Sequence, residues 1–411
     1  MLPRWVRRGV VAPAVVFLAG FVLLGIPVIL LLGLAISPTI PGRWRPLRFL
    51  WFAFLYLLLE AALLVTLFLL WIGTGFGYRM DSPWSQRLHY QLLGFTLRVL
   101  ETEAGRVLNV SIESSGATPD DFHGRPLIVL SRHAGAGDSF LLVDLLVNWY
   151  ARDPRIVLKS ALQWDPALDV LLNRLPAVFV DNDPGVDRIG LIHRLASNLD
   201  ENDAFTIFPE GGNFTSARRQ KSITWLVSEG RSSRAARAEK LRHVLAPRQA
   251  GTATALQASP EADVAIVAHT GLEHLTSAKA VWRYMPMDTT IKVHWWRVPA
   301  HEAPSDPEAV GDWLFGWWSL VDGWIEANRP EVVDVAIADP DTPTGRRQAR
   351  RPRLSPRASC APARWSACSR RSAGSCPATP GGEAGCGAPA GSARRRPATR
   401  RRCAAAGSAA R

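Results

Sequence analysis

Two long apolar stretches open the chain, and shorter apolar runs alternate with amphipathic ones after them. Residues 9–37 carry no charged side chain, and residues 49–72 carry one, Glu60. At about 1.5 Å of rise per residue, a helix over either stretch can cross an apolar layer about 30 Å thick. Tryptophans gather near the ends of these stretches, as in a membrane aromatic belt: Trp5, Trp44, Trp51, Trp71 and Trp84. The pattern predicts a two-helix transmembrane hairpin within residues 1–80, with spans at about 9–37 and 49–72.

Glu60 is the one acidic group in the predicted spans. A carboxylate in the middle of a bilayer is costly unless it is paired or protonated. Glu60 is expected either to have a functional role or to pack toward the partner helix of the hairpin. A hairpin returns the rest of the chain to the side on which it began.

The pattern changes between about residues 85 and 335. Short apolar and β-branched runs occur at 126–131, 155–159, 177–181, 204–208 and 263–268, and most are separated by helical stretches at 138–150, 166–174, 186–199 and 220–229. Such alternation is typical of an α/β domain with a mostly parallel sheet flanked by helices. A further strand at 290–298 alternates only partly and is expected at an edge.

Polar side chains follow four of the predicted strands. His133 comes shortly after the first, Lys159 ends the second, Asn182 follows the third and Glu210 follows the fourth. Ligands of parallel sheets bind beyond the carboxyl ends of the strands. We therefore expect a base, an ammonium, an amide and a carboxylate on one rim.

His133 and Asp138 are separated by four residues that include Gly135 and Gly137. An extended chain would hold the two about 17 Å apart, so contact requires the loop to curl, which glycine permits. Asp138 would then lie in the first turn of a helix, where negative charge is favoured. An aspartate that accepts from one imidazole nitrogen leaves the other free to act as a base. The alternative is a surface loop with a solvated histidine and a helix-capping aspartate.

The formal net charge of +12 comes from the last part of the chain. Residues 345–411 contain 16 arginines, one acidic residue and all five cysteines. The preceding residues therefore offer no cysteine nucleophile, disulfide or thiolate zinc site. The tail has few aliphatic residues and is expected to be disordered. It is either a polybasic lipid-binding arm or an extension that merely reflects its composition.

These motifs resemble the glycerolipid acyltransferases, the family of lysophospholipid and 1-acylglycerol-3-phosphate acyltransferases. His133 and Asp138 match its first block, the sequence FPEG at 208–211 matches the third, and LAPRQAG at 245–251 resembles the fourth. The segment 292–304 resembles the one after the family's core, which suggests the lysocardiolipin-like branch. The resemblance covers residues 90–330 and implies a glycerol-phosphate-acyltransferase-like fold after the hairpin.

The family's activity implies roles for the candidate residues. His133 would be the general base, Asp138 would orient it, and substrates would contact Lys159, Asn182, Glu210, Gly211, Asn213 and Arg248. The donor would be acyl-CoA or acyl carrier protein and the acceptor a lysophospholipid in the membrane. No cofactor, metal or nucleic acid is implied. The catalytic domain is expected in the cytoplasm, on the bacterial inner membrane or its equivalent, because the donors are cytoplasmic.

Two positions depart from the family pattern. Arginines that are usual in the second and third blocks are replaced by Asn182 and Asn213, so Arg248 is the first choice for binding an anionic head group.

Two other functions fit parts of the sequence. One is a metal-dependent hydrolase with His133, Asp138 and Glu210 as ligands. The other is an inactive membrane protein whose basic tail binds lipid. A helical stripe that includes Trp313, Trp317 and Trp324 would either contact the membrane or pack on the domain.

Overall fold

The computed structural model describes residues 2–40, 44–119, 124–135, 137–180, 185–273 and 278–330. Its chain divides into two units, residues 1–335 and 336–411, and all the described residues lie in the first. Asn182 and the basic tail at 345–411 lie outside the described residues.

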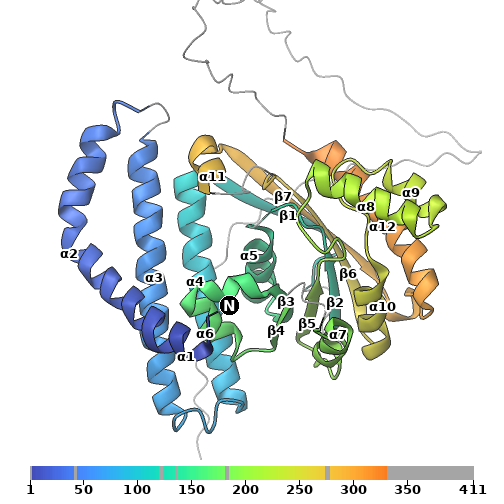
Figure 1. Cartoon of the computed structure of the whole chain (residues 1–411), viewed down its shortest axis with the longest axis horizontal. Helices are drawn as coiled ribbons and strands as arrows, with labels where there is room; N and C mark the ends of the chain where they lie inside the picture. Colours follow the sequence, from blue (N-terminus) through green and yellow to red (C-terminus); the bar gives the residue numbers. More distant parts are fainter. Residues whose placement is uncertain are drawn as a thin grey trace, which may run out of the picture. The chain divides into compact units, whose positions relative to one another are not determined.

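One mixed sheet forms the centre of the described region (Figure 1). Its seven strands lie in the order β1-β7-β6-β2-β5-β3-β4. The strands are β1 (Val110–Gly116), β2 (Leu127–Ser131), β3 (Asp153–Lys159), β4 (Ala177–Val180), β5 (Asp203–Ile207), β6 (Asp263–Thr270) and β7 (Thr289–Val298). Strands β6, β2, β5, β3 and β4 are parallel, whereas β7 is antiparallel to β6, and β1 is parallel to β7. The mostly parallel α/β fold is thus confirmed.

The expectation that residues 290–298 form an edge strand is wrong, because β1 pairs with β7 along its outer side. The sequence VSIESSG of β1 is rich in serine and only partly buried, so it lacks the apolar run that marks a buried strand. β1 was therefore missed. Strand β7 becomes an inner strand through tertiary pairing.

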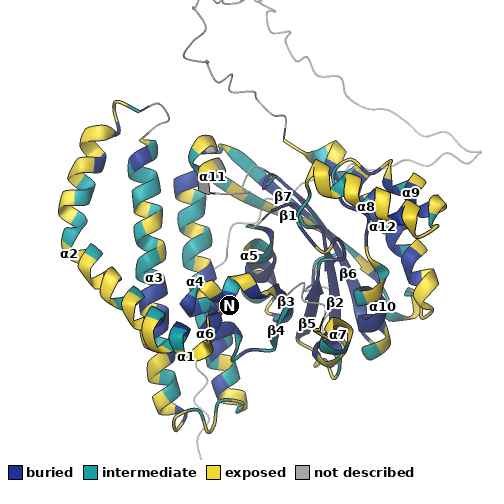
Figure 2. Ribbon diagram, viewed as in Figure 1, coloured by how far each residue is buried: buried dark blue, intermediate teal, exposed yellow. Residues whose placement is uncertain are grey.

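Helices cover both faces of the sheet. One core joins alternate residues of β2, β5 and β6 to α7 (Arg188–Ala196), α8 (Ser216–Ser228), α9 (Ser232–Ala238), α10 (Gln249–Ala258) and α12 (Pro307–Asn328). The opposite residues of β2 and β6 pack with β7, α5 (Gly137–Asp144) and the π-helix η3 (Leu145–Trp149). Short elements complete this region: η4 (Ser160–Trp164), α6 (Pro166–Leu172), α11 (Ala278–Tyr284) and η5 (Ala300–Glu302). Both faces of the central strands are dark in Figure 2, as expected for a parallel sheet.

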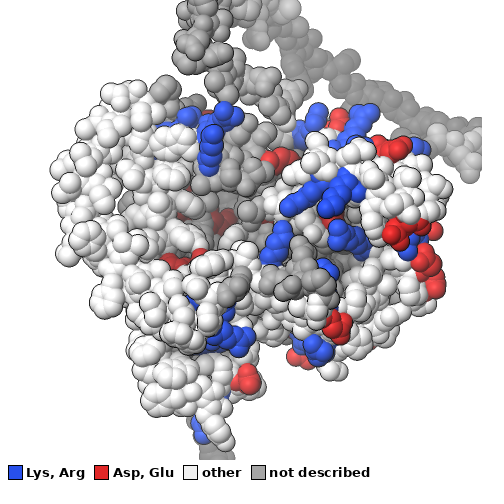
Figure 3. Space-filling view, in the orientation of Figure 1, with Lys and Arg blue, Asp and Glu red and all other residues white. Residues whose placement is uncertain are grey.

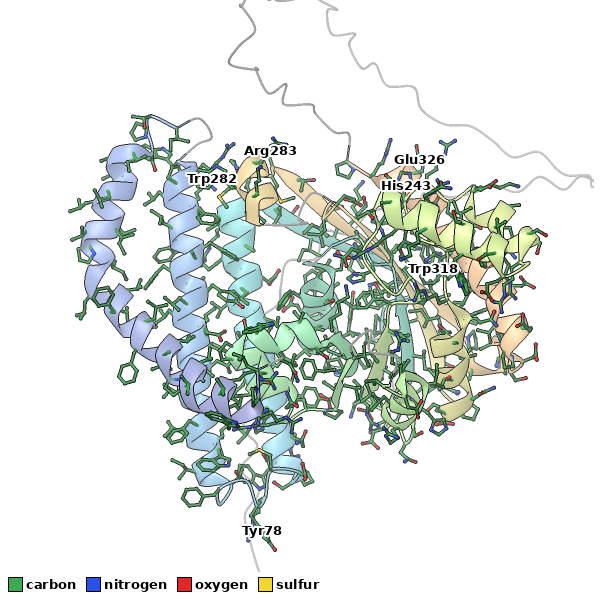
Figure 4. The ribbon with its side chains drawn as sticks, in the orientation of Figure 1. Tyr78, His243, Trp282, Arg283, Trp318 and Glu326 are labelled. Atoms are coloured by element: carbon green, nitrogen blue, oxygen red, sulfur yellow. The ribbon has the colours of Figure 1, made fainter. Side chains whose placement is uncertain are left out.

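The tryptophan-rich helix α12 packs on the domain. Leu314, Trp318 and Val321 are fully buried, and Trp318 points into the interior beneath the helix (Figure 4). Trp313, Trp317 and Trp324 are partly buried against the same core. Of the two alternatives for this stripe, packing accounts for its apolar face.

The N-terminal region forms an antiparallel pair of long helices. The first runs through α1 (Arg4–Val6), the π-helical η1 (Arg7–Val11) and α2 (Ala12–Ile36), and the second is α3 (Arg45–Gly73). By length and composition, both could cross a membrane, a test that a buried core helix or a signal sequence can also pass. An exposed apolar stripe follows one face of α2 and consists of Phe17, Phe21, Leu24, Val28 and Leu31. Most of α2 is yellow in Figure 2.

Helix α3 packs against the α/β region at its start and near its middle. At its start, Arg48 donates to the carbonyl of Val107, near the end of α4 (Pro83–Leu108), at 2.6 Å. Near its middle, Glu60 accepts from the backbone N–H of Ala167 at 2.9 Å, at the start of α6. Glu60 therefore bonds to α6 rather than to α2, so of its two alternatives packing toward the partner helix is wrong.

The start of the hairpin also binds α6. The buried Arg7 guanidinium lies 3.0 Å from the carboxylate of Asp169, and Arg8 contacts the same carboxylate at 3.1 Å. Arg4 donates to Asn173 at 3.2 Å. These bonds hold the N-terminus of the hairpin against α6.

Candidate functional site

The loop after β2 curls as the glycine spacing predicted. His133 Nδ1 lies 3.2 Å from Asp138 Oδ2, and Asp138 stands in the first turn of α5. The same carboxylate oxygen accepts the backbone N–H groups of Ala134 and Gly135, the latter at 2.7 Å. One buried carboxylate thus closes the loop and holds the imidazole.

His133 is also packed from one side. The ring of Phe208 stacks on its imidazole, with centroids 4.5 Å apart and an angle of 28° between the planes. The His133 side chain is 13% exposed, and it lines a cavity. Burial raises the pKa of Asp138, but hydrogen bonds and the imidazoles of His269 and His133 outweigh burial and lower it. An ionised Asp138 places a proton on His133 Nδ1 and leaves Nε2 available as a base.

Glu210 joins two loops of the site and does not line the cavity. Its side chain accepts the backbone N–H of His133 at 2.9 Å through one oxygen and that of Leu245 at 2.8 Å through the other. The residue is only 2% exposed. Both of its oxygens accept backbone N–H groups, and the expected contact of Glu210 with the acceptor stays a prediction. Burial raises its pKa to about 8, against the opposing effect of the two N–H bonds.

Backbone bonds join the other motif residues to this centre. Phe214 N–H donates to the His133 carbonyl at 2.9 Å, and Arg248 N–H donates to the Pro209 carbonyl at 2.9 Å. The N–H of Gly211 donates to the Phe208 carbonyl at 3.0 Å within a turn, so this amide is not free to receive an oxyanion. Gly211 has φ +67°, a conformation that glycine adopts without strain.

An apolar cavity of about 370 Å³ opens at His133. Its walls come from α3, α4, α5, β3 and α6, and among the lining side chains are Leu63, Leu97, Val143, Leu158 and Leu171. The volume lies in the range of small-ligand sites, and the walls suit an alkyl chain. Helix α3 belongs to the N-terminal hairpin, so the hairpin supplies part of the cavity wall.

Three cations lie near the Gly211 turn: Lys159, Arg218 and Arg248. A side chain at Gly211 would come within 3.3 Å of the Arg248 guanidinium, and one at Gly212 within 3.4 Å of that of Arg218. Burial and then the charge of Arg218 lower the pKa of Lys159, which lines the cavity together with Asn213. Arg218 also donates to the Asn213 carbonyl at 3.0 Å. Basic side chains gather over α8 on the face shown in Figure 3.

Two buried residues of the site were not identified from the sequence. The first is His269, whose Nε2 lies 3.8 Å from Asp138 Oδ2. The second is Arg132, which forms an ion pair with Glu273 at 2.7 Å. The available signal for His269 was its position at the carboxyl end of a predicted strand, beside the strand that carries His133.

The described ranges contain no group of three or more His, Cys, Asp or Glu side chains arranged to hold a metal ion. His133 and Asp138 converge, but the third expected ligand of the hydrolase hypothesis, Glu210, is bound to backbone amides.

The buried, hydrogen-bonded state of Glu210 can be tested by measuring how stability depends on pH. Its ordinary pKa of 4.5 is raised to about 8, so folding retains a proton that the unfolded chain releases between these values. We expect the stabilising contribution of this group to be fully present below pH 4.5 and to fall as the pH rises toward 8. Glu210→Gln has no titrating group at this position. The difference in melting temperature between the wild type and this variant should therefore shift against the wild type as the pH rises from 5 to 8. A constant difference across this window would contradict the expected protonation.

Comparison with known proteins agrees with the motifs. Residues 110–270, from β1 to the end of β6, match the sequence model of the family described as Acyltransferase. The crystal structure of the 1-acyl-sn-glycerophosphate (LPA) acyltransferase PlsC from Thermotoga maritima aligns with a TM-score of 0.43 and 13% sequence identity, over 69% of this chain and 97% of that chain. The curated proteins gave no match. The family domain includes His133, Asp138 and Glu210, while the lysocardiolipin-like branch stays a prediction. Residues 110–270 thus form an acyltransferase domain, which supports an acyltransferase enzyme.

Proposed function

We propose that this enzyme moves a fatty acyl group from an acyl thioester, on CoA or acyl carrier protein, to a hydroxyl of a lysophospholipid-type acceptor. The observation that carries the proposal is the His133–Asp138 pair, joined at 3.2 Å, at an apolar cavity. The name of the Thermotoga maritima protein is consistent with such an acceptor.

In the proposed reaction, His133 Nε2 takes the proton of the acceptor hydroxyl while that oxygen attacks the thioester carbonyl. The imidazolium that forms is stabilised by Asp138, which is held in place by the Ala134 and Gly135 N–H groups. When the tetrahedral intermediate collapses, the C–S bond breaks and the proton on Nε2 passes to the leaving thiolate. The products are an ester and a free thiol, and neither a covalent acyl-enzyme nor a cofactor is required.

The acyl chain of a substrate would occupy the apolar cavity. Leu63 and Leu97 contribute to its wall from α3 and α4, whereas Leu158 and Leu171 do so from β3 and α6. A thioester carbonyl at the mouth would then lie beside His133. This arrangement would make the hairpin part of the substrate site.

The acceptor's anionic head group would be bound by the cations around Gly211. Arg248 is the strongest candidate because its guanidinium lies over Gly211 and its backbone is tied to Pro209. Lys159 and Arg218 would add charge from β3 and α8. Together they would replace the family arginines that are absent at Asn182 and Asn213.

The hairpin would attach the enzyme to the membrane that holds its lipid substrate and product. The apolar stripe on α2 has Phe17, Phe21 and Leu24 each at least 76% exposed, which is unusual for a surface in contact with water. Because Arg7 and Arg8 bind α6, the N-terminus and the catalytic region would share one side. We place that side in the cytoplasm, where the acyl donors are.

The general base is tested by His133→Ala in membranes supplied with labelled acyl-CoA and a panel of lysophospholipids. Loss of the base should lower kcat by about 10² to 10⁴. His301→Gln is the matched control, because its side chain is 82% exposed and does not line the cavity, and it should retain full activity. Undiminished transfer by His133→Ala would falsify the mechanism, and loss of transfer in EDTA would favour the hydrolase alternative.

The head-group site is tested by Arg248→Ala. A hydrogen bond to a charged group contributes about 1.5–3 kcal/mol, so KM for a phosphate-bearing acceptor should rise at least about tenfold. KM for the thioester should stay the same. Lys240→Ala, which removes an exposed cation that does not line the cavity, is the control. An equal change in both KM values would argue against a dedicated acceptor site at Arg248.

Membrane attachment is tested by replacing Phe21 and Leu24 together with aspartate. An aspartate at the centre of an apolar helix opposes insertion by about 3 kcal/mol, so the variant should leave the membrane fraction or float poorly with vesicles. Leu320→Asp, at a 56% exposed apolar position of α12, should float like the wild type. Unchanged flotation of the double variant would exclude the α2 stripe as the contact.

A further inference from the structure

A second histidine lies directly beneath the proposed catalytic pair. Strand β6 pairs with β2 in parallel, with Val267 opposite Ser131, and continues past the end of β2. The backbone N–H of Arg132 extends the ladder by donating to the Val267 carbonyl at 3.2 Å. His269, two residues further along β6, is thereby brought under the loop that carries His133, and it is only 2% exposed.

His269 and Arg132 bind each other reciprocally. The imidazole Nε2 of His269 lies 3.2 Å from the Arg132 carbonyl, while the Arg132 guanidinium donates to the His269 carbonyl. Because a carbonyl can only accept, the proton of a neutral His269 ring is on Nε2. The other ring nitrogen, Nδ1, has no hydrogen-bond partner within the described part of the chain.

The same Nε2 also faces the catalytic carboxylate, 3.8 Å from Asp138 Oδ2. This distance is too long for a strong hydrogen bond, but the positive end of the N–H dipole acts on a carboxylate that is itself almost fully buried. Asp138 Oδ1 has no hydrogen-bond partner among the described residues. His269 is therefore a polar group next to Oδ2, the same carboxylate oxygen that contacts His133.

Burial favours the neutral form of His269, and three charged groups lie around it. The Arg132 guanidinium forms an ion pair with Glu273 at 2.7 Å. It also donates at 3.3 Å to the carbonyl of His243, whose side chain lies beside Glu326 (Figure 4). Burial, reinforced by the charge of Arg132, lowers the pKa of His269 despite the opposing charges of Asp138 and Glu273. Although burial raises it, the contacts with Arg132 lower the pKa of Glu273 to about 2.

We propose that His269 is a positioning residue, whose Nε2–H holds the Arg132 carbonyl and weakens the field of Asp138 at His133. The inference rests on the proposed role of His133 as the general base. Its consequence is specific: without His269, Asp138 would stabilise the His133 imidazolium more strongly. The acid limb of the pH–rate profile would then lie at a higher pH than in the wild type.

The test is the pH profile of kcat for His269→Leu, which removes the N–H, and His269→Gln, which can place an amide N–H near the position of Nε2. For His269→Leu we expect kcat to fall about tenfold or more, since the loop loses a support next to the base. The acid limb should move to higher pH by up to about one unit, because a shift of that size corresponds to the net free energy of one hydrogen bond. His269→Gln should restore most of kcat and return the limb toward the wild-type position. His301→Gln is the control for replacing a histidine.

Melting temperatures in detergent show whether each variant is folded. If His269→Leu does not accumulate as folded protein, His269→Asn replaces it, because the shorter amide also leaves the Arg132 carbonyl without its donor. A lower kcat with an unmoved acid limb would reduce His269 to a merely structural residue and overturn the inference. So would a wild-type kcat and profile in His269→Leu. Full activity of His133→Ala would instead overturn the proposed base, so the two failures are distinguishable.

Discussion

The site depends on one buried carboxylate. Asp138 Oδ2 accepts two backbone N–H groups from the loop and contacts His133 Nδ1, so a single oxygen closes the loop and orients the ring. A buried charge is tolerated only when hydrogen bonds compensate for its lost hydration. The loop amides meet this requirement, and in doing so they leave the other nitrogen of His133 directed to the cavity region. The orientation of the His133 ring thus follows from the hydrogen bonds that solvate Asp138.

A second constraint joins the hairpin to the catalytic region through α6. This short helix receives Glu60 at its first turn and presents Asp169 to Arg7 and Arg8. Removing one partner of a buried ion pair costs more free energy than forming the pair gains, because the remaining charge is left buried and unpaired. The position of the hairpin on α6 is therefore well defined. Since α6 and α3 also line the cavity, the contacts that hold the apolar helices shape the place where an acyl chain would lie.

The sequence predicted the features that consecutive residues encode. The strands containing Val129 and Phe205 were evident because both of their faces are apolar, and the curl at Gly135 was evident because the spacing to Asp138 demands it. Strand β1 was missed, since its serines give no apolar signal, and β7 was wrongly expected at an edge, since its outer neighbour is that same strand. The sequence placed Glu210 near His133 but gave no sign that its two oxygens accept the backbone N–H groups of His133 and Leu245.

The amino-acid sequence by itself determined two apolar helices, an α/β domain and a histidine with an aspartate five positions later. These are properties of local spacing and of hydropathy, which each segment carries alone. Only the tertiary structure decided that Glu210 ties His133 to Leu245, that His269 lies beneath Asp138, and that α3 closes the cavity. The partners in these contacts are tens to more than a hundred residues apart, and each buried polar group selects its partner only after packing has excluded water.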